Sequence, residues 1–196
     1  MSEFRTLVLC GLGNPGFRYA ETRHNLGFML IDYIRCTFSF PEFLPKFSGL
    51  LSSGRVSSSL LYLFKPVAFM NNSGRPLVQL VNFYKVEPEN VIVFHDDIDL
   101  DFAKVKIKRG GGSGGHNGLK SLDANLGRDY WRFRFGVGRG VGEPAEHVLS
   151  CFTSLELERL NKLFGFIGTN LPLLLSDIAT HKEKFLGEYS TAVSKG

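Results

Sequence analysis

The sequence has few cysteines and no long apolar run. Only three of its 196 residues are cysteine, and Cys10, Cys36 and Cys151 are scattered along the chain. An odd, scattered set does not make a disulfide framework or a zinc site, so we expect a reducing compartment. No stretch approaches the roughly 20 apolar residues that a membrane helix needs, and no basic-then-apolar signal segment opens the chain. We therefore expect a cytoplasmic protein that does not contact membranes.

The sequence also lacks the short motifs of common metal and dinucleotide enzymes. It contains no H-E-x-x-H and no C-x-x-C. Residues 11–16 (GLGNPG) have the formal spacing G-x-G-x-x-G, but Pro15 and Gly16 favour a turn, whereas the dinucleotide signature opens a helix. The acidic residue expected about 20 positions later, Asp32, falls inside a predicted helix. We interpret the run as a tight turn whose Asn14 amide can point into a cleft, and a dinucleotide enzyme stays a distant alternative.

What is present fits one α/β domain. Hydrophobic residues make up 43% of the chain, enough for one sizeable core, and the net charge of +4 suits an RNA partner as well as many ordinary enzymes. Alternating strand-like and helix-like segments predict a single layered domain with a mixed, mostly parallel central sheet flanked by helices. We place this domain at residues 1–190, followed by a frayed tail at 191–196, and interpret the polar stretch 52–59 as a turn between strands. The predicted strands are Thr6–Cys10, Leu60–Phe64, Val91–Phe94, Ala103–Lys108 and Arg132–Val137, and the predicted helices are roughly Thr22–Cys36, Arg75–Tyr84, Gly118–Leu126, Ser154–Gly168 and Leu171–Phe185.

A glycine-dense run between two basic strands is the most informative feature. Residues 110–118 read GGGSGGHNG. The strand before the run alternates apolar residues with Lys104, Lys106 and Lys108, and the strand after it alternates them with Arg132 and Arg134. Period-2 alternation is typical of half-buried strands, so both solvent faces should be cationic. Such faces beside a loop that admits close backbone approach indicate a groove for a phosphate-bearing partner, or else they are merely solvated.

His24 lies at the predicted start of a helix, with Thr22 as its N-cap. The positive end of the helix dipole disfavours imidazolium, so we expect a neutral ring that can act as a general base. Taken alone, the motif around His24 favours a surface or capping histidine over a catalytic one.

Two further motifs follow predicted strands. Residues 95–99 (HDDID) carry clustered carboxylates, which are typical of a cation site and leave a metal-dependent phosphoesterase as an alternative. We prefer Asp96 as the partner that orients a histidine acting on water, as such acids do in hydrolytic triads. In residues 69–74 (FMNNSG), Asn71 is either a helix cap or an amide in the same cleft as Asn14, with Phe69 and Met70 as an apolar wall.

Taken together, five motifs resemble those of the bacterial-type peptidyl-tRNA hydrolase family, in the same order and spacing. They are GLGNPG at 11–16, TRHN at 22–25, FMNNSG at 69–74, HDD at 95–97 and GGHNG at 114–118, and the resemblance spans Leu7 to about Gly140. It implies an enzyme that hydrolyses the ester between a peptide and the terminal ribose of tRNA, which recycles tRNA from stalled or dropped-off translation. We expect no cofactor, no metal ion and no stable protein partner, and hence a monomer that acts on peptidyl-tRNA.

The resemblance also implies roles for individual residues. His24 matches the family's catalytic base, and Asp96 matches its orienting acid. The other matches are Asn14, Asn71 and Asn117 as amides that hold the peptide end, the water and the tRNA 3′ end, Tyr19, Phe69, Met70 and His116 as cleft residues around them, and Lys108 and Arg134 as a basic pair for a tRNA phosphate.

Some positions depart from the family pattern. Residues 101–103 (DFA) replace a turn that usually contains proline and glycine, and Arg109 adds a charge. The region after Gly140, which the resemblance makes a mobile lid over the cleft, matches only loosely. Because plant relatives in this family act as RNA-splicing factors through binding, a non-catalytic RNA-binding protein is the main alternative.

Overall fold

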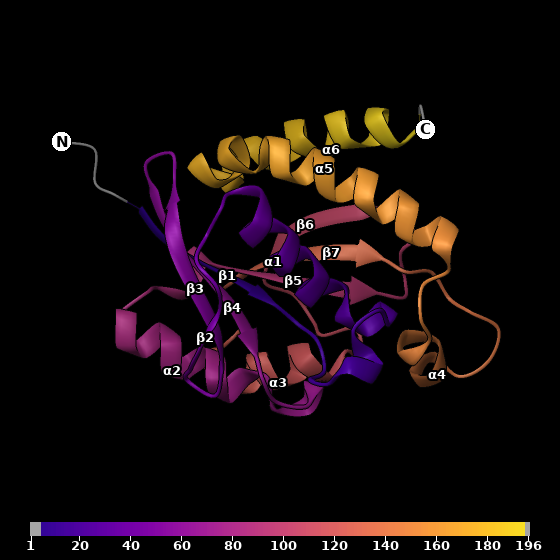
Figure 1. Ribbon diagram of the computed structural model, residues 1–196, viewed down its shortest axis with the longest axis horizontal. Coiled ribbons are helices and arrows are strands. Elements are labelled where there is room, and N and C mark those ends of the chain that lie inside the picture. Colours follow the sequence, from indigo (N-terminus) through magenta and orange to yellow (C-terminus); the bar gives the residue numbers. More distant parts are fainter. Residues whose placement is uncertain (1–4, 195–196) are drawn as a thin grey trace.

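A seven-stranded mixed sheet forms the centre of the fold (Figure 1), and the computed structural model describes residues 5–194. Along the sheet the order is β2-β3-β4-β1-β5-β7-β6. The β4/β1, β1/β5 and β5/β7 pairs are parallel, whereas β2/β3, β3/β4 and β6/β7 are antiparallel. The predicted layered domain with a mixed central sheet flanked by helices is thus confirmed, and the parallel pairs lie at the centre of that sheet. The strands are β1 (Arg5–Gly11), β2 (Leu44–Lys46), β3 (Gly49–Val56), β4 (Ser59–Pro66), β5 (Val91–Asp97), β6 (Val105–Arg109) and β7 (Trp131–Gly136).

Helices cover both faces of this sheet (Figure 1) and make two apolar cores. One face carries α1 (Leu26–Thr37), α5 (Ser154–Ser176) and α6 (Ile178–Ser194), and the other carries α2 (Gly74–Tyr84) and α3 (Asn117–Leu126). The consecutive residues Leu7 and Val8 of β1 point to opposite faces of the sheet, and both are fully buried, one in each core, as expected for a central strand. Strands of this kind read as continuous apolar runs. No helix within residues 5–194 is long and apolar enough to cross a membrane.

Four parallel strands end at the same edge of the sheet. In open α/β sheets, binding sites form beyond the carboxyl ends of such strands. The short helical turns η1 (Phe17–Tyr19), η2 (Arg23–Asn25) and η3 (Met70–Asn72) follow β1 and β4, and α4 (Pro144–Leu149) follows β7. A fourth turn, η4 (Pro88–Asn90), leads into β5.

Strand β3 occupies most of the stretch that we predicted to be a turn. The chain reverses only at Ser57, whose φ is 53°, and β4 begins at Ser59. Serines misled the prediction because they suggest loops, yet the hydroxyl of Ser52 is buried and donates to the Pro41 carbonyl at 2.7 Å. Edge strand β2 was also missed. It contains Pro45, which an edge strand tolerates.

The C-terminal helices extend beyond their predicted ends. Helix α5 continues through Pro172 to Ser176, because Leu171, Leu174 and Leu175 prolong its buried face. The predicted start of the last helix at Leu171 is therefore wrong, since α6 begins only at Ile178. Helix α6 continues to Ser194, so the predicted frayed tail is wrong for residues 191–194, and residues 195–196 lie outside the described part of the chain. Tyr189 ties α6 down, since its buried hydroxyl donates to the Ala103 carbonyl.

Candidate active site

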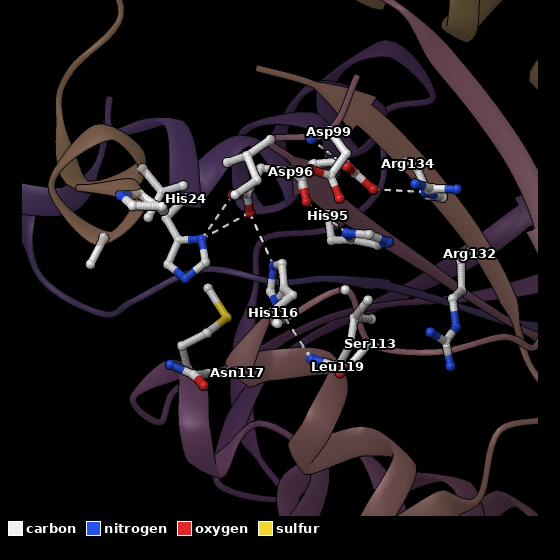
Figure 2. Close-up of a pocket in the computed structure, with 18 of the residues that line it drawn as sticks. His24, His95, Asp96, Asp99, Ser113, His116, Asn117, Leu119, Arg132 and Arg134 are labelled. Atoms are coloured by element: carbon white, nitrogen blue, oxygen red, sulfur yellow. Dashed lines mark hydrogen bonds and ion pairs between the residues drawn. The ribbon is translucent and has the colours of Figure 1, made fainter. Parts of the chain in front are cut away.

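A cleft of about 860 Å³ opens at the carboxyl edge of the parallel strands (Figure 2). All the predicted site residues line it except Tyr19, whose ring instead packs under the Arg18 guanidinium at 4.7 Å. The polar residues of the lining come from the ends of different strands and from the turns after them. The predicted residues in the lining are Asn14, His24, Phe69, Met70, Asn71, Asp96, Lys108, His116, Asn117 and Arg134.

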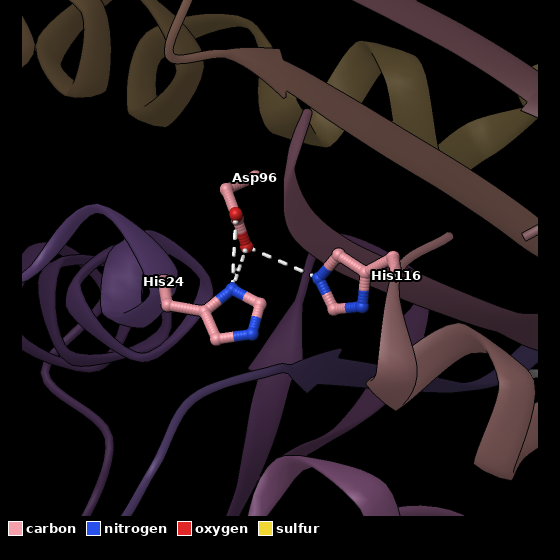
Figure 3. Close-up of side chains that lie close together, drawn as sticks. All are labelled: His24, Asp96 and His116. Atoms are coloured by element: carbon pink, nitrogen blue, oxygen red, sulfur yellow. Dashed lines mark hydrogen bonds and ion pairs between the residues drawn. The ribbon is translucent and has the colours of Figure 1, made fainter. Parts of the chain in front are cut away.

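Asp96 connects two histidines at the centre of this cleft (Figure 3). The Nδ1 atom of His24 lies 2.9 Å from Oδ1 and 3.0 Å from Oδ2 of Asp96, and the Nε2 atom of His116 lies 3.1 Å from Oδ1. Burial raises the pKa of the Asp96 carboxyl, but the adjacent His24 and His116 lower it more, so its pKa lies well below the ordinary value. Asp96 is therefore an ionised acceptor that two ring N–H groups satisfy.

The hydrogen bonds fix which nitrogen of each ring carries the proton. An ionised Asp96 can only accept, so the Nδ1 atom of His24 must donate, and the Nε2 atom of a neutral His24 is left as a lone pair. In His116 the Nδ1 atom accepts from the backbone N–H groups of Gly118 (3.1 Å) and Leu119 (3.3 Å), so its proton is on Nε2. Of the two rings that bind Asp96, only that of His24 therefore keeps a nitrogen with an available lone pair.

The position of His24 beside Asp96 depends on contacts on both sides of its turn. On one side, helix α1 packs so closely on the strand ends that a Cβ atom on Gly27 would lie 2.3 Å from the Phe94 carbonyl oxygen. On the other side of the turn, Arg23 donates from Nη1 to the Cys151 carbonyl (2.8 Å) and from Nη2 to Oε1 of Glu156 (2.7 Å). His24 lies in η2 and not in the first turn of α1 as predicted.

The predicted amides surround the histidine pair. Asn14 is buried and its Oδ1 accepts from the Met70 backbone N–H at 3.0 Å, which leaves its Nδ2 as the donor available to a ligand. The side chain of Asn25 holds Asn14 in place, because its Oδ1 accepts from the Asn14 backbone N–H at 2.8 Å and its Nδ2 donates to the Asn14 carbonyl at 2.9 Å. The side chains of Asn71 and Asn117 are exposed at the cleft.

A neighbouring histidine stays neutral beneath the cleft. His95 is buried, and its Nδ1 lies 2.7 Å from the Asp96 backbone carbonyl, to which it donates. Burial, with His116 alongside, lowers the pKa of His95 to about 3. His95 is therefore uncharged at neutral pH and adds no positive charge beside Asp96.

The cationic side of the cleft differs in part from the prediction. Lys108 lies under the glycine loop, and burial together with repulsion from Arg134 and Arg132 lowers its pKa. Arg134 donates to Oδ2 of Asp97 at 2.7 Å. Arg132 does not face solvent at all, since its side chain is 0% exposed. Lys104 precedes β6 and lies 3.9 Å from an Asp101 carboxylate oxygen.

Helix α4 contributes an apolar wall through Pro144, Ala145, Val148 and Leu149, in the region after Gly140 that the family resemblance makes a lid over the cleft. Sequence reasoning missed one serine of the lining. Residues 111–115 (GGSGG) have the G-x-S-x-G spacing of a nucleophile elbow, and Ser113 lines the cleft. No histidine hydrogen-bonds the Ser113 hydroxyl among the described contacts, so the loop lacks the base that such a serine needs.

The residues that could hold a metal ion differ from those that the sequence suggested. In residues 5–194, the one group able to hold an ion is His24, Asp96 and His116, whose ligand atoms lie within 4.8 Å of one another. The Nε2 atom of His116 carries a proton because Nδ1 accepts two N–H groups, so a bound cation would require an imidazolate. The geometry therefore suits hydrogen bonding better than coordination, and the predicted cluster at 95–99 does not form such a group.

Comparisons with known proteins agree with this geometry. The sequence profile of the peptidyl-tRNA hydrolase family matches residues 8–192. Among curated relatives, peptidyl-tRNA hydrolase from Neorickettsia sennetsu is 93% identical over 189 residues, which cover 96% of this chain and 97% of the relative. The enzyme of the same name from Ehrlichia ruminantium is 47% identical over 93% of this chain and 96% of its own length. A crystal structure of a mutant peptidyl-tRNA hydrolase from Acinetobacter baumannii has a TM-score of 0.82 at 30% identity, over 99% of this chain and 94% of that chain.

Proposed function

The chain belongs to the peptidyl-tRNA hydrolase family, and we propose that it hydrolyses the ester between peptide and tRNA with His24 as general base. The observation that carries this proposal is the hydrogen-bonded pair of His24 and Asp96, which leaves the Nε2 lone pair of His24 facing the cleft. A neutral imidazole with one free nitrogen suits proton abstraction from water near pH 7. Ionised Asp96 stabilises the imidazolium that results.

The reaction then proceeds by direct attack of water. His24 takes one proton while the water oxygen bonds to the ester carbonyl carbon, which gives a tetrahedral intermediate. The intermediate collapses as the bond to the ribose oxygen breaks, and the imidazolium returns its proton to that oxygen. The products are a free peptide carboxylic acid and a tRNA with a free terminal hydroxyl.

The amides bind the substrate around the ester, and the cations bind its tRNA part. Amide donors such as Asn14 Nδ2 and Asn117 stabilise the negative oxygen of the intermediate or hold the peptide end and the tRNA 3′ end. Phe69 and Met70 form the apolar wall, together with α4. Lys108 and Arg134 bind a phosphate of the tRNA, which supplies affinity and carries no base sequence information. Asn71 holds the attacking water.

We further propose that the protein works as a cytoplasmic monomer without cofactor, recycling tRNA from stalled translation. The proposal of a monomer is supported by the cleft, whose lining within one chain includes His24 and Asp96, the amides and the cations. A purely RNA-binding role finds no support, since binding alone does not require the His24–Asp96 pair.

One assay tests the proposed function. Purified protein is incubated with a peptidyl-tRNA and with a free aminoacyl-tRNA, and the release of each acyl group is followed. We expect selective release of the peptide. Binding of peptidyl-tRNA without release by freshly folded protein would instead make the chain an RNA-binding relative. His181→Asn, on α6 outside the cleft lining, serves as the matched control for histidine substitutions.

A further inference from the structure

Arg132 is fully buried although it lies on the strand face that was predicted to meet tRNA. Arg132 and Arg134, two residues apart on the same strand, both border the cleft (Figure 2). The side chain of Arg132 is nevertheless 0% exposed, whereas that of Arg134 is only partly buried. The Nη1 atom of Arg132 donates to the Gly112 carbonyl at 2.7 Å, and its Nη2 donates to Oδ1 of Asp123 at 2.7 Å. Because a guanidinium stays charged, burying it is costly unless it is paired and hydrogen-bonded. Such a group is placed to hold protein atoms and not a solvent-borne phosphate.

The carbonyl that Arg132 binds belongs to the glycine loop of the cleft. Gly111, Gly114 and Gly115 have φ values of 99°, 56° and 83°, a region that costs glycine little, so the loop has many accessible conformations. Within residues 111–115, the other hydrogen bond that the structure describes is local, from the His116 N–H to the Ser113 carbonyl at 3.0 Å. Arg132 therefore makes the one described side-chain hydrogen bond between this loop and the sheet.

The guanidinium is itself fixed from the helix that follows the loop. Asp123 lies in α3, and its Oδ1 accepts from the Tyr130 hydroxyl (2.7 Å) as well as from Arg132. Helix α3 begins at Asn117, and His116 caps it. Arg132 on the sheet thus contacts both the middle of the loop, at Gly112, and helix α3, at Asp123. His116 and Asn117 lie at the start of that helix.

We propose that Arg132 is a positioning residue that holds the glycine loop as a fixed wall of the cleft and does not bind tRNA. Ordering a glycine-rich segment costs conformational entropy, and one charge-assisted hydrogen bond to Gly112 offsets part of that cost before substrate arrives. This inference rests on the function proposed above, because it names the contact that holds His116 and Asn117 at their positions relative to Asp96.

Backbone ¹⁵N relaxation of the loop glycines tests the proposal. In the native chain we expect order parameters near the rigid value of about 0.85, falling below about 0.6 in Arg132→Met. The hydrolysis of peptidyl-tRNA should fall by about tenfold to a hundredfold in kcat/KM, as for loss of one hydrogen bond to a charged group. The matched control is Arg128→Met, which removes an exposed guanidinium 3.6 Å from Oδ2 of Asp123 without touching Gly112. It should keep both the loop order and the activity.

The salt dependence of tRNA binding separates an anchor from a ligand. Lys108→Ala should lower the slope of log affinity against log salt by roughly one unit, because one phosphate contact is lost. Arg132→Met should leave that slope unchanged. A slope reduced as in Lys108→Ala, or loop glycines as ordered as in the native chain, would overturn the proposal.

A measurement on the native chain keeps the test decisive even if Arg132→Met does not fold. Low order parameters for Gly111, Gly114 and Gly115 in the unmodified protein would contradict an anchored loop. Relaxation requires no substrate, so its outcome stands whether or not the chain hydrolyses peptidyl-tRNA.

Discussion

His24 and His116 donate to the same oxygen atom, Oδ1 of Asp96, at 2.9 and 3.1 Å, with their ring centroids 4.8 Å apart (Figure 3). The two rings are nevertheless not equivalent. The second nitrogen of His116 accepts two backbone N–H groups at the start of α3, whereas the second nitrogen of His24 has no described partner in residues 5–194. The site therefore holds one ring with an available nitrogen and one ring that is fixed as a hydrogen-bond donor.

Removal of the base should abolish most of the chemistry and little of the binding. We expect His24→Ala to reduce the turnover of peptidyl-tRNA by about 10² to 10⁴, the range for losing a general base. Single-turnover release of peptide measures the loss, and a tRNA binding titration should be nearly unchanged. Asp96→Asn should cost less, because it disturbs orientation and leaves the base. Near-native turnover in His24→Ala would make another residue the base, with His116 the first to test.

The buried His95 should make the protein less stable as the pH falls. Its folded pKa of about 3 lies below the ordinary value of about 6.5, so between these values the unfolded chain binds a proton that the folded chain does not. The free energy of unfolding should therefore decrease on acidification from about pH 6.5, by up to about 1.4 kcal/mol per pH unit from this group. Asp96, with its depressed pKa, adds a further loss below about pH 4.

Urea denaturation at a series of pH values between 7 and 4 measures this dependence. His95→Asn should flatten the curve, since an amide keeps a donor for the Asp96 carbonyl and has no proton to gain. The control His181→Asn should keep the native slope. Identical slopes for the native chain and His95→Asn would show that His95 does not carry the effect.

Chelation should leave activity intact. The ester carbonyl can be polarised by amide donors such as Asn14 and Asn117, and the His116 proton points at Asp96 where a cation would have to bind. We expect the same rate of peptide release before and after exhaustive chelation. Activity that is lost in chelator and restored by magnesium, manganese or zinc would revive a metal-dependent mechanism at His24, Asp96 and His116.

The paired cations should act on tRNA and not on the ester. In the double variant Lys108→Ala with Arg134→Ala, we expect weaker tRNA binding, a shallower salt dependence and a higher KM. Hydrolysis of a minimal peptidyl-nucleotide ester, which lacks the bound phosphate, should be largely preserved and serves as the internal control. If both substrates are affected equally, or neither is, then the two residues supply only a diffuse positive field.

Much of the fold and of the site could be predicted because the signals are local. Apolar runs such as Val91–Phe94 predicted the buried strands. Every site residue that was predicted from the sequence, except Tyr19, lines the cleft. Tyr19 was misplaced because the spacing of a motif does not say which way a side chain turns.

Other features depend on contacts between distant residues, which no local pattern carries. The alternation of apolar and basic residues could not predict that Arg132 is buried, because its burial depends on hydrogen bonds to Asp123 and to the Gly112 carbonyl. The protonation pattern of His24 likewise depends on Asp96, 72 residues away, and on the bonds that His116 makes. Strand periodicity predicts a face of the sheet, and only the folded chain shows what covers that face.

The bond between Arg23 and Glu156 links residues 133 positions apart. Because a protein is made from its N-terminus, the turn that bears His24 leaves the ribosome well before the start of α5 exists. Until then the nascent chain lacks the carboxylate and the Cys151 carbonyl that brace this turn from outside. A growing chain is itself the peptide of a peptidyl-tRNA, so the turn that bears His24 lacks these two contacts for most of the time that the chain's own ester to tRNA is intact.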